Sequence, residues 1–156
     1  MVSMVVLLDF VVLLEYCSVA YVISWNIKGS GCPLKRSYIH DFLKIYCIDI
    51  VLIQESKALF PSDSFFRSLG GSFINGWSHL NSNGASGGQI IGWRDNIIEY
   101  SDELIGEFLL SVRLTHRRTR QDFVVISIYE PCSEWRQVDL WHELSNTRGW
   151  AIAHGW

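Results

Sequence analysis

The chain has 156 residues, which suits one domain of ordinary size. Hydrophobic residues make up 49% and aromatic residues 13%, a composition that excludes a disordered protein. The formal net charge of −3 argues against a binder whose whole surface is cationic, and it leaves open a local basic patch or a metal ion that carries the positive charge. Seven tryptophans indicate either a large core or apolar surface that awaits a partner.

The four cysteines are Cys17, Cys32, Cys47 and Cys132, and they form neither a Cys-x-x-Cys pair nor a compact group with histidine. This spacing does not predict a structural zinc site. A chain of this length can build a core without disulfides, so we favour reduced thiols inside a cell, in the nucleus or the cytoplasm.

The stretch 1–22 is the most hydrophobic part of the chain, and it is interrupted by Asp9 and Glu15. Two acids near the centre of a membrane span would cost about 2.5–3.5 kcal/mol each, so contact with a membrane is not expected. The first basic residue is Lys28, which leaves a secretory signal without its positive region. Residues 18–20 nevertheless match a small-x-small cleavage site, so secretion remains the alternative.

We therefore divide the chain into an apolar N-terminal extension, residues 1–20, and one domain, residues 21–156. The extension is free to form a helix that lies against the domain.

From residue 21 onward, strand and helix patterns alternate. A β-rich segment at 21–25 is followed by a turn cluster at 29–31. Apolar residues then recur at intervals of three and four, which predicts a helix over 33–46, with Pro33 in its first turn. The apolar run within 49–54 predicts a strand buried on both faces. Together these segments form one strand–helix–strand unit.

The rest of the chain is less regular. We predict a short helix at 61–69, a polar loop at 81–88 and a longer helix at 134–145, together with strands at 89–93, 108–115 and 123–129. The basic run 116–120 lies where the tip of a hairpin is expected.

Three polar side chains, Asn26, Glu55 and Tyr129, stand where predicted strands end. Sites in layered α/β folds gather at strand ends. A carboxylate at Glu55 suits Mg²⁺, which takes few protein oxygens and keeps its waters, and an amide at Asn26 can orient a phosphate or a metal-bound water. The plain alternative is that Asn26 caps a turn and Glu55 is the first solvated residue after its strand. The phenol of Tyr129 either donates to a phosphate or covers the edge of the core.

The basic run holds Arg117, Arg118 and Arg120, which either contact a nucleic-acid backbone or lie on a solvated hairpin tip. Gly87 and Gly88 precede a strand and allow a close approach of the backbone. The loop has no Gly-x-x-x-x-Gly-Lys pattern, so a P-loop is not supported.

The order of the motifs resembles that of one known family. Ser24-Trp25-Asn26-Ile27-Lys28-Gly29 is followed by Lys35-Arg36 and then by Ile53-Gln54-Glu55-Ser56-Lys57. Ser86-Gly87-Gly88-Gln89 and Ile128-Tyr129-Glu130-Pro131 follow as later landmarks. From about residue 21 to 150 the chain is similar to the endonuclease/exonuclease/phosphatase (DNase I-like) family, and above all to the apurinic-type endonuclease domain of plant LINE retrotransposons.

The resemblance implies a mixed α/β (α+β) fold, a β-sandwich flanked by helices, that hydrolyses phosphodiesters of DNA with Mg²⁺ or Mn²⁺. It implies that Glu55 ligates the metal, that Asn26 helps to place metal and phosphate, and that Tyr129 contacts the phosphate. The metal would stabilise charge on the phosphate while an activated water attacks.

The chain departs from the family where the family's Gly-Asp-x-Asn and Ser-Asp-His motifs are expected, because neither sequence occurs. Glu130 also stands where the family has glycine between tyrosine and proline. We therefore expect the N-terminal part of such a domain, truncated and inactive as it stands.

The alternative from another class is a non-catalytic half-domain that binds nucleic acid or self-associates. Loss of half a sandwich predicts an uncovered apolar face around Val51, Ile53, Val125 and Ile126.

Overall fold

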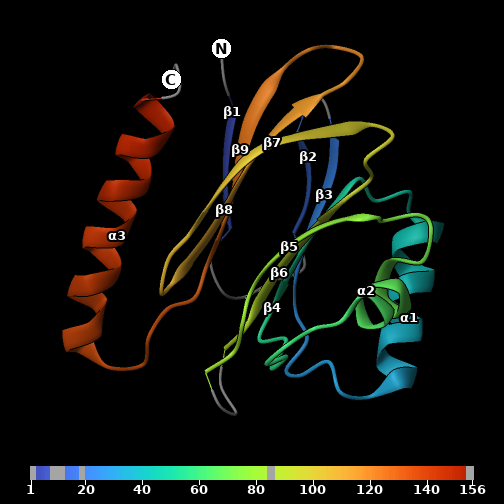
Figure 1. The fold of residues 1–156 in the computed structure, drawn as a ribbon, viewed down its shortest axis with the longest axis horizontal. Coiled ribbons are helices and arrows are strands. Elements are labelled where there is room, and N and C mark those ends of the chain that lie inside the picture. Colours follow the sequence, from blue (N-terminus) through green and yellow to red (C-terminus); the bar gives the residue numbers. More distant parts are fainter. Residues whose placement is uncertain (1–2, 8–12, 18–19, 84–86, 154–156) are drawn as a thin grey trace.

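The computed structural model describes residues 3–7, 13–17, 20–83 and 87–153. Two β-sheets pack face to face, with helices on both outer sides (Figure 1). This arrangement confirms the mixed α/β (α+β) sandwich flanked by helices that the sequence predicts.

The first sheet has five strands in the order β2-β3-β4-β6-β5. Their bounds are β2 Leu13–Cys17, β3 Ala20–Asn26, β4 Ile50–Gln54, β6 Gln89–Trp93 and β5 Gly76–Leu80. Strands β3 and β4 are parallel and are connected through helix α1, Pro33–Ile45, so the predicted strand–helix–strand unit is confirmed. Helix α2, Asp63–Gly70, lies beside α1 on the outer face of this sheet (Figure 1).

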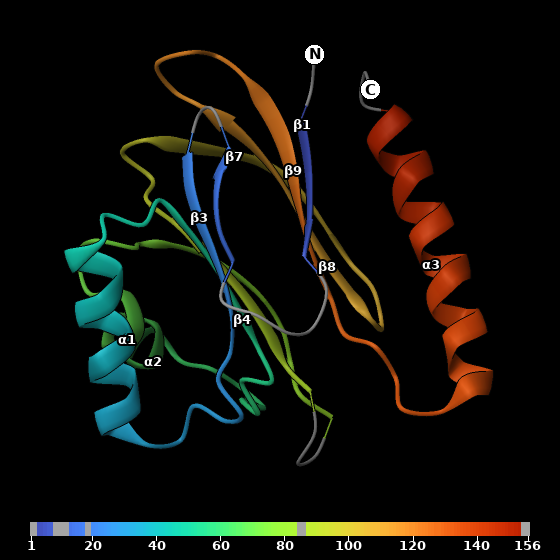
Figure 2. The ribbon, with the colours of Figure 1, turned by 180° about the vertical axis from the view of Figure 1, so that it is seen from behind.

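The second sheet has four strands in the order β1-β9-β8-β7. Their bounds are β1 Ser3–Leu7, β9 Asp122–Ile128, β8 Leu109–His116 and β7 Ile98–Ile105. Helix α3, Glu134–Ala153, covers its outer face (Figure 2). The carboxylate of Glu143 on this helix accepts hydrogen bonds from the backbone N–H groups of Phe108 and Leu109 at 3.0–3.2 Å, which fixes α3 to the start of β8.

Alternation along the strands separates the apolar side chains into three layers. Leu52 of β4 and Val125 of β9 belong to the cluster between the two sheets, whereas Val51 and Ile53 pack with residues of α1 and α2. Ile126 packs beneath α3 with Leu140. The apolar run of β4 is thus buried on both faces, as predicted, because a second sheet lies on one side and helices lie on the other.

The prediction of an uncovered apolar face is wrong. Val51 and Val125 have no exposed surface, Ile53 has none either, and Ile126 is 3% exposed. The reason is that strands of both sheets are present within these 156 residues, so the sandwich closes on itself. The surface on which we based the prediction of self-association is therefore buried.

The N-terminal stretch also differs from the helix considered above. Residues 3–7 form β1, which pairs in parallel with β9, and residues 13–17 form β2, which pairs antiparallel with β3. The stretch thus supplies one edge strand to each sheet, because its valine- and leucine-rich segments pair with the open edges of β9 and β3. Asp9 lies outside the described residues. Among the residues that the structure describes, no helix is both long and apolar enough to cross a membrane.

The other predicted helices and strands agree with the structure within a few residues, except that α3 continues to Ala153. Residues 84–86 of the predicted loop lie outside the described residues. Besides β1 and β2, two further strands were not predicted. Strand β5 begins at Gly76 and lacks a clear apolar alternation, and β7 is a polar edge strand that carries Ser101, Asp102 and Glu103. Edge strands bury little, so their sequences hold a weak strand signal.

Candidate functional site

The strands that carry Asn26, Glu55 and Tyr129 all end at one end of the sandwich. We call this end, formed by the ends of β3, β4 and β9 and the beginnings of β6 and β8, the site rim; the opposite end, where β4 begins and the β8–β9 hairpin turns, is the far end (Figure 2). A hydrogen bond of 3.4 Å from Gln54 Nε2 to the Ile128 carbonyl connects the two sheets at the rim.

Asn26 is the last residue of β3 and lies opposite Gln54 in the parallel pair with β4. Its Oδ1 accepts a hydrogen bond from the backbone N–H of Lys28 at 3.1 Å. The Ile27 N–H donates to the Gln54 carbonyl at 3.1 Å and continues the pairing by one step. The amide of Asn26 therefore stabilises a turn beside the end of β4, as the turn-capping alternative expects.

Glu55 directly follows β4 and is half-buried. Its φ of 50° places it in the left-handed region, and its carbonyl accepts a hydrogen bond from Gly29 N–H at 2.7 Å. Lys28 and Lys57 have φ angles of 50° and 53°, so the rim holds three of the five left-handed non-glycine residues in the described part of the chain. Such conformations are disfavoured and gather at functional sites.

Tyr129 follows β9, and its backbone N–H donates to the Phe108 carbonyl at 2.8 Å. The residue lines a cavity of about 450 Å³ at the rim, together with Gln89, Asn81 and Arg136. The structure thus places all three predicted residues at the same end of the sandwich, on neighbouring segments. Their chemical roles stay predictions.

The sequence analysis missed a polar row inside the rim. Gln54 and Gln89 are register partners, and they are 2% and 1% exposed. Gln89 Nε2 donates to the Phe108 carbonyl at 2.9 Å, and its buried Oε1 has no hydrogen-bond partner among the described residues. With Asn26 the two glutamines form an amide row across β3, β4 and β6. Their signal in the sequence is a polar residue on the inward parity of an otherwise apolar strand.

Gly88 brings the loop before β6 close to the residue after Glu55. Its φ is +86°, and a Cβ there would overlap the hydroxyl of Ser56. Ser56 N–H donates to the Gly88 carbonyl and Lys57 N–H to the Gly87 carbonyl, both at 3.0 Å. The close approach expected for this glycine pair is therefore present, and it fixes the backbone beside Glu55.

Four cations surround the rim. Lys35 Nζ donates to the carbonyls of Ile27 and Gly29 at 2.9 and 3.0 Å, and Arg36 Nη1 donates to the Ser30 carbonyl at 2.6 Å. Lys28 and Lys57 are exposed. Within the described ranges, none of these four has a carboxylate at ion-pair distance. The rim therefore presents uncompensated positive charge beside one carboxylate.

The donor set at the rim suits a hard cation that keeps most of its waters. Among the residues that the structure describes, no three His, Cys, Asp or Glu side chains come together as a ligand group. Glu55 supplies one carboxylate and Asn26 one amide oxygen, and Mg²⁺ is commonly held by one or two carboxylates with water or phosphate oxygens. By donor type, these two residues suit Mg²⁺ or Mn²⁺ better than zinc.

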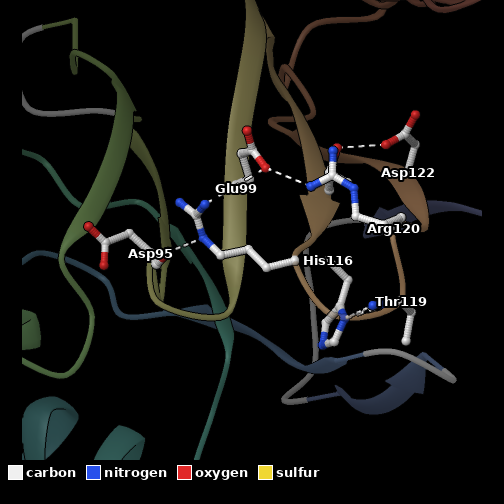
Figure 3. Close-up of polar contacts among 8 residues, drawn as sticks. Asp95, Glu99, His116, Thr119, Arg120 and Asp122 are labelled. Carbon is white, nitrogen blue, oxygen red and sulfur yellow. Dashed lines mark hydrogen bonds and ion pairs between the residues drawn. The ribbon is translucent and has the colours of Figure 1, made fainter.

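The arginine run predicted at a hairpin tip lies at the far end, away from the rim. Arg117 donates to the Asp95 carbonyl at 2.6 Å and pairs with Glu99 at 3.7 Å. Arg120 pairs with the same carboxylate at 3.1 Å (Figure 3). Two of the three arginines thus satisfy an acid of β7, which favours the solvated-tip interpretation.

No protein family and no curated protein matches this chain by sequence. Solved structures do match its fold. An endonuclease/exonuclease/phosphatase family protein from Bacteroides thetaiotaomicron aligns with a TM-score of 0.60 at 11% identity, over 86% of this chain and 57% of that one. The human Nocturnin catalytic domain with bound sulfate gives 0.55 at 14% identity, over 81% of this chain and 57% of that one.

A third match is D. rerio TDP2 in complex with a single-strand DNA product, with a TM-score of 0.55 at 18% identity, over 81% of this chain and 54% of that one. The chain spans between half and three fifths of the length of these three structures. Its two sheets and flanking helices have the DNase I-like fold of the endonuclease/exonuclease/phosphatase proteins.

Proposed function

We propose that this chain is the N-terminal part of a divalent-metal-dependent phosphodiesterase, an endonuclease of the LINE retrotransposon type that acts on DNA. The observation that carries the proposal is the placement of Asn26, Glu55 and Tyr129 at one rim, beside cations that have no carboxylate partner among the described residues. The shared fold and the order of the sequence motifs support the same function. The LINE origin rests on the motifs alone.

In this proposal Glu55 and Asn26 hold a Mg²⁺ or Mn²⁺. The bound metal supplies a Lewis acid that stabilises negative charge on the phosphate. The left-handed backbone at Glu55, fixed through Gly29, keeps the carboxylate at the rim. Tyr129 donates its phenol hydrogen to a phosphate oxygen, and Lys57 attracts the polyanionic substrate.

Residues 1–156 contain neither Gly-Asp-x-Asn nor Ser-Asp-His, so the resemblance leaves the base for the attacking water unassigned. General acid–base assistance contributes about 10²–10⁴-fold to a rate. Loss of one electrostatic donor costs about 10²–10³-fold. These losses are not additive, yet together they reduce turnover below detection. We therefore propose that these 156 residues alone bind metal and nucleic acid without cleaving.

The test measures binding and cleavage side by side. We expect Mn²⁺ to bind the chain weakly, as detected by paramagnetic relaxation of water, and Glu55→Gln to abolish this binding without a change in thermal unfolding. Asp63→Asn, an exposed acid at the start of α2, is the matched control. Nicking of supercoiled or abasic DNA should not exceed that of Glu55→Ala. Cleavage that Glu55→Ala abolishes would refute the hypothesis that these residues alone are inactive. Mn²⁺ binding that Glu55→Gln does not affect would refute the proposed metal site.

A second function is a non-catalytic module that binds nucleic acid. The uncompensated cations at the rim favour it, since they attract phosphates whether or not a metal is present. The two functions separate in EDTA. A non-catalytic module keeps its affinity for DNA there and is indifferent to Glu55→Gln, whereas a metal-dependent site binds phosphate more tightly with Mg²⁺.

A further inference from the structure

The segment between β4 and α2 carries an apolar side chain that the fold does not use. Phe60 is 87% exposed, the highest value among the large hydrophobic residues that the structure describes, and its neighbour Leu59 is 49% exposed. A single exposed apolar residue is common on protein surfaces. The position of this one, next to the rim and among cations, is what gives it meaning.

The segment is held at both ends, so Phe60 projects from a fixed base. Lys57 N–H donates to the Gly87 carbonyl, and the Ala58 carbonyl accepts from Ser82 N–H, each at 3.0 Å. At the other end, the Ser62 hydroxyl accepts from Phe65 N–H at 3.3 Å and caps α2. A group held in place before binding loses less conformational freedom when it binds, which favours a recognition role.

The surroundings of Phe60 are basic and hollowed. A cavity of about 290 Å³ is lined by Arg36, Lys57, Phe60 and Phe65. The Arg36 guanidinium lies 5.6 Å from the centre of the Phe65 ring, and its buried Nε has no hydrogen-bond partner in the described part of the chain. Neither Arg36 nor Lys57 has a carboxylate partner there. An aromatic ring beside unpaired cations suits a ligand with both π-faces and phosphates.

We propose that Phe60 stacks on an unpaired nucleobase of a single-stranded or frayed nucleic acid whose adjacent phosphates contact Lys57 and Arg36. The inference deepens the proposed function and rests on its assignment of a nucleic-acid substrate. Stacking of a base on an aromatic side chain tolerates any sequence, because every base has a π-face. Lys57 lies between Phe60 and Glu55 in the sequence, two residues after Glu55. The path of the nucleic-acid strand therefore leads from Phe60 to the rim.

The test measures binding of a fluorescently labelled oligothymidine by anisotropy in EDTA, at several salt concentrations. We expect Phe60→Ala to weaken binding about tenfold, as one lost stacking contact does, and to leave the salt dependence unchanged. Phe60→Trp should restore affinity. Lys57→Ala should reduce the salt slope by about one phosphate contact. Trp141→Ala, which removes another exposed aromatic residue, 66% exposed on α3, is the control and should bind like the original chain.

Each contrary outcome is distinct. Equal affinity of Phe60→Ala and the original chain, with a weakened Lys57→Ala, would overturn stacking and leave the proposed function in place. Absence of oligothymidine binding by the original chain both in EDTA and with Mg²⁺ would overturn both. In a third outcome, the original chain forms a concentration-dependent dimer in sedimentation, and Phe60→Ala abolishes this dimer without weakening DNA binding. This result would assign the surface to a second copy of this chain and overturn the proposal.

Discussion

The two ends of the sandwich treat charge in opposite ways. At the far end Arg94 pairs with Asp49 at 3.1 Å, and Arg117 and Arg120 share Glu99. At the site rim the cations Lys28, Lys35, Arg36 and Lys57 have no carboxylate partner among the described residues, and Glu55 has none of them as an ion-pair partner.

Left-handed non-glycine residues occur at both ends, at Lys28, Glu55 and Lys57 of the rim and at Cys47 and Arg120 of the far end. Charge pairing, more than backbone conformation, therefore distinguishes the two ends. Charge that lacks a partner of opposite sign attracts oppositely charged ligands. Under the proposed function, one end of this sandwich serves stability and the other serves binding.

The largest expected effect comes from breaking the most buried ion pair of the far end. Asp49 also accepts a hydrogen bond from Tyr21 N–H at 2.9 Å, so Asp49→Ala removes the carboxylate acceptor from both this N–H and the Arg94 guanidinium. We expect a loss of about 2–3 kcal/mol in the free energy of unfolding, less than for a fully buried pair because Arg94 is partly exposed. Urea denaturation measures it, and affinity for oligothymidine should not change. A loss below 0.5 kcal/mol, on the order of a surface pair, would contradict the role given to this end.

A smaller effect of the opposite sign is expected at the rim. A left-handed conformation costs a non-glycine residue about 1–2 kcal/mol, and glycine avoids this cost. Glycine also loses more conformational freedom on folding, which offsets about 0.5–1 kcal/mol of the gain. Lys57→Gly should therefore stabilise the protein by about 0.5–1 kcal/mol in urea denaturation while it weakens DNA binding. Cys47→Gly, at the far end, should stabilise similarly and leave binding intact. Equal DNA affinity of the two variants would contradict the binding role given to Lys57.

A still smaller effect is expected for the exposed acid of the far end. Glu99→Gln removes two surface ion pairs, with Arg117 and Arg120, each worth less than about 1 kcal/mol and screened by salt. The midpoint temperature of thermal unfolding should fall by a few degrees at low salt and hardly at all at high salt. If the freed arginines raise DNA affinity substantially, the hairpin tip is a nucleic-acid contact after all.

The smallest expected effect concerns thiol reactivity and not stability. One cysteine lies at each end of helix α1, and thus at each end of the sandwich, so the two thiols can be compared. Hydrogen bonds from the backbone N–H groups of Lys35 and Leu34, with smaller contributions from the charges of Lys35 and Arg36, lower the pKa of the exposed Cys32 thiol. A lowered pKa means more thiolate at a given pH, so alkylation of Cys32 should begin at lower pH than for a free thiol. Iodoacetamide labelling followed by mass spectrometry should modify Cys32 before Cys47. Simultaneous labelling would show that the rim does not favour anions.

Much of the fold could be predicted because the central elements are strongly patterned. The run from Ile50 to Ile53 and the periodicity of α1 are set by burial, and burial leaves a clear signal in the sequence. The edge strands β5 and β7 were missed because one side of each is solvated. The uncovered face was predicted wrongly because a motif comparison shows which family segments are absent, and it does not show how the remaining strands pair.

The candidate site divides along similar lines. Asn26, Glu55 and Tyr129 could be placed at strand ends from the sequence, since a strand end is a local feature. Gln54 and Gln89 could not be recognised as a pair, because their juxtaposition depends on the register of β4 with β6, 35 residues apart in the chain. Phe60 gives no signal at all, since exposure is a property of the folded surface.

The most direct test of the account removes three positive charges from one end or the other. One variant combines Lys28→Ala, Arg36→Ala and Lys57→Ala at the rim; the other combines Arg117→Ala, Arg118→Ala and Arg120→Ala at the far end. The measurement is the salt dependence of oligothymidine affinity in EDTA. The account predicts that the rim variant loses about two units of the logarithmic salt slope, at roughly 0.7 per single-strand phosphate contact, and that the far-end variant keeps the slope of the original chain. A slope reduced in the far-end variant and unchanged in the rim variant would contradict it.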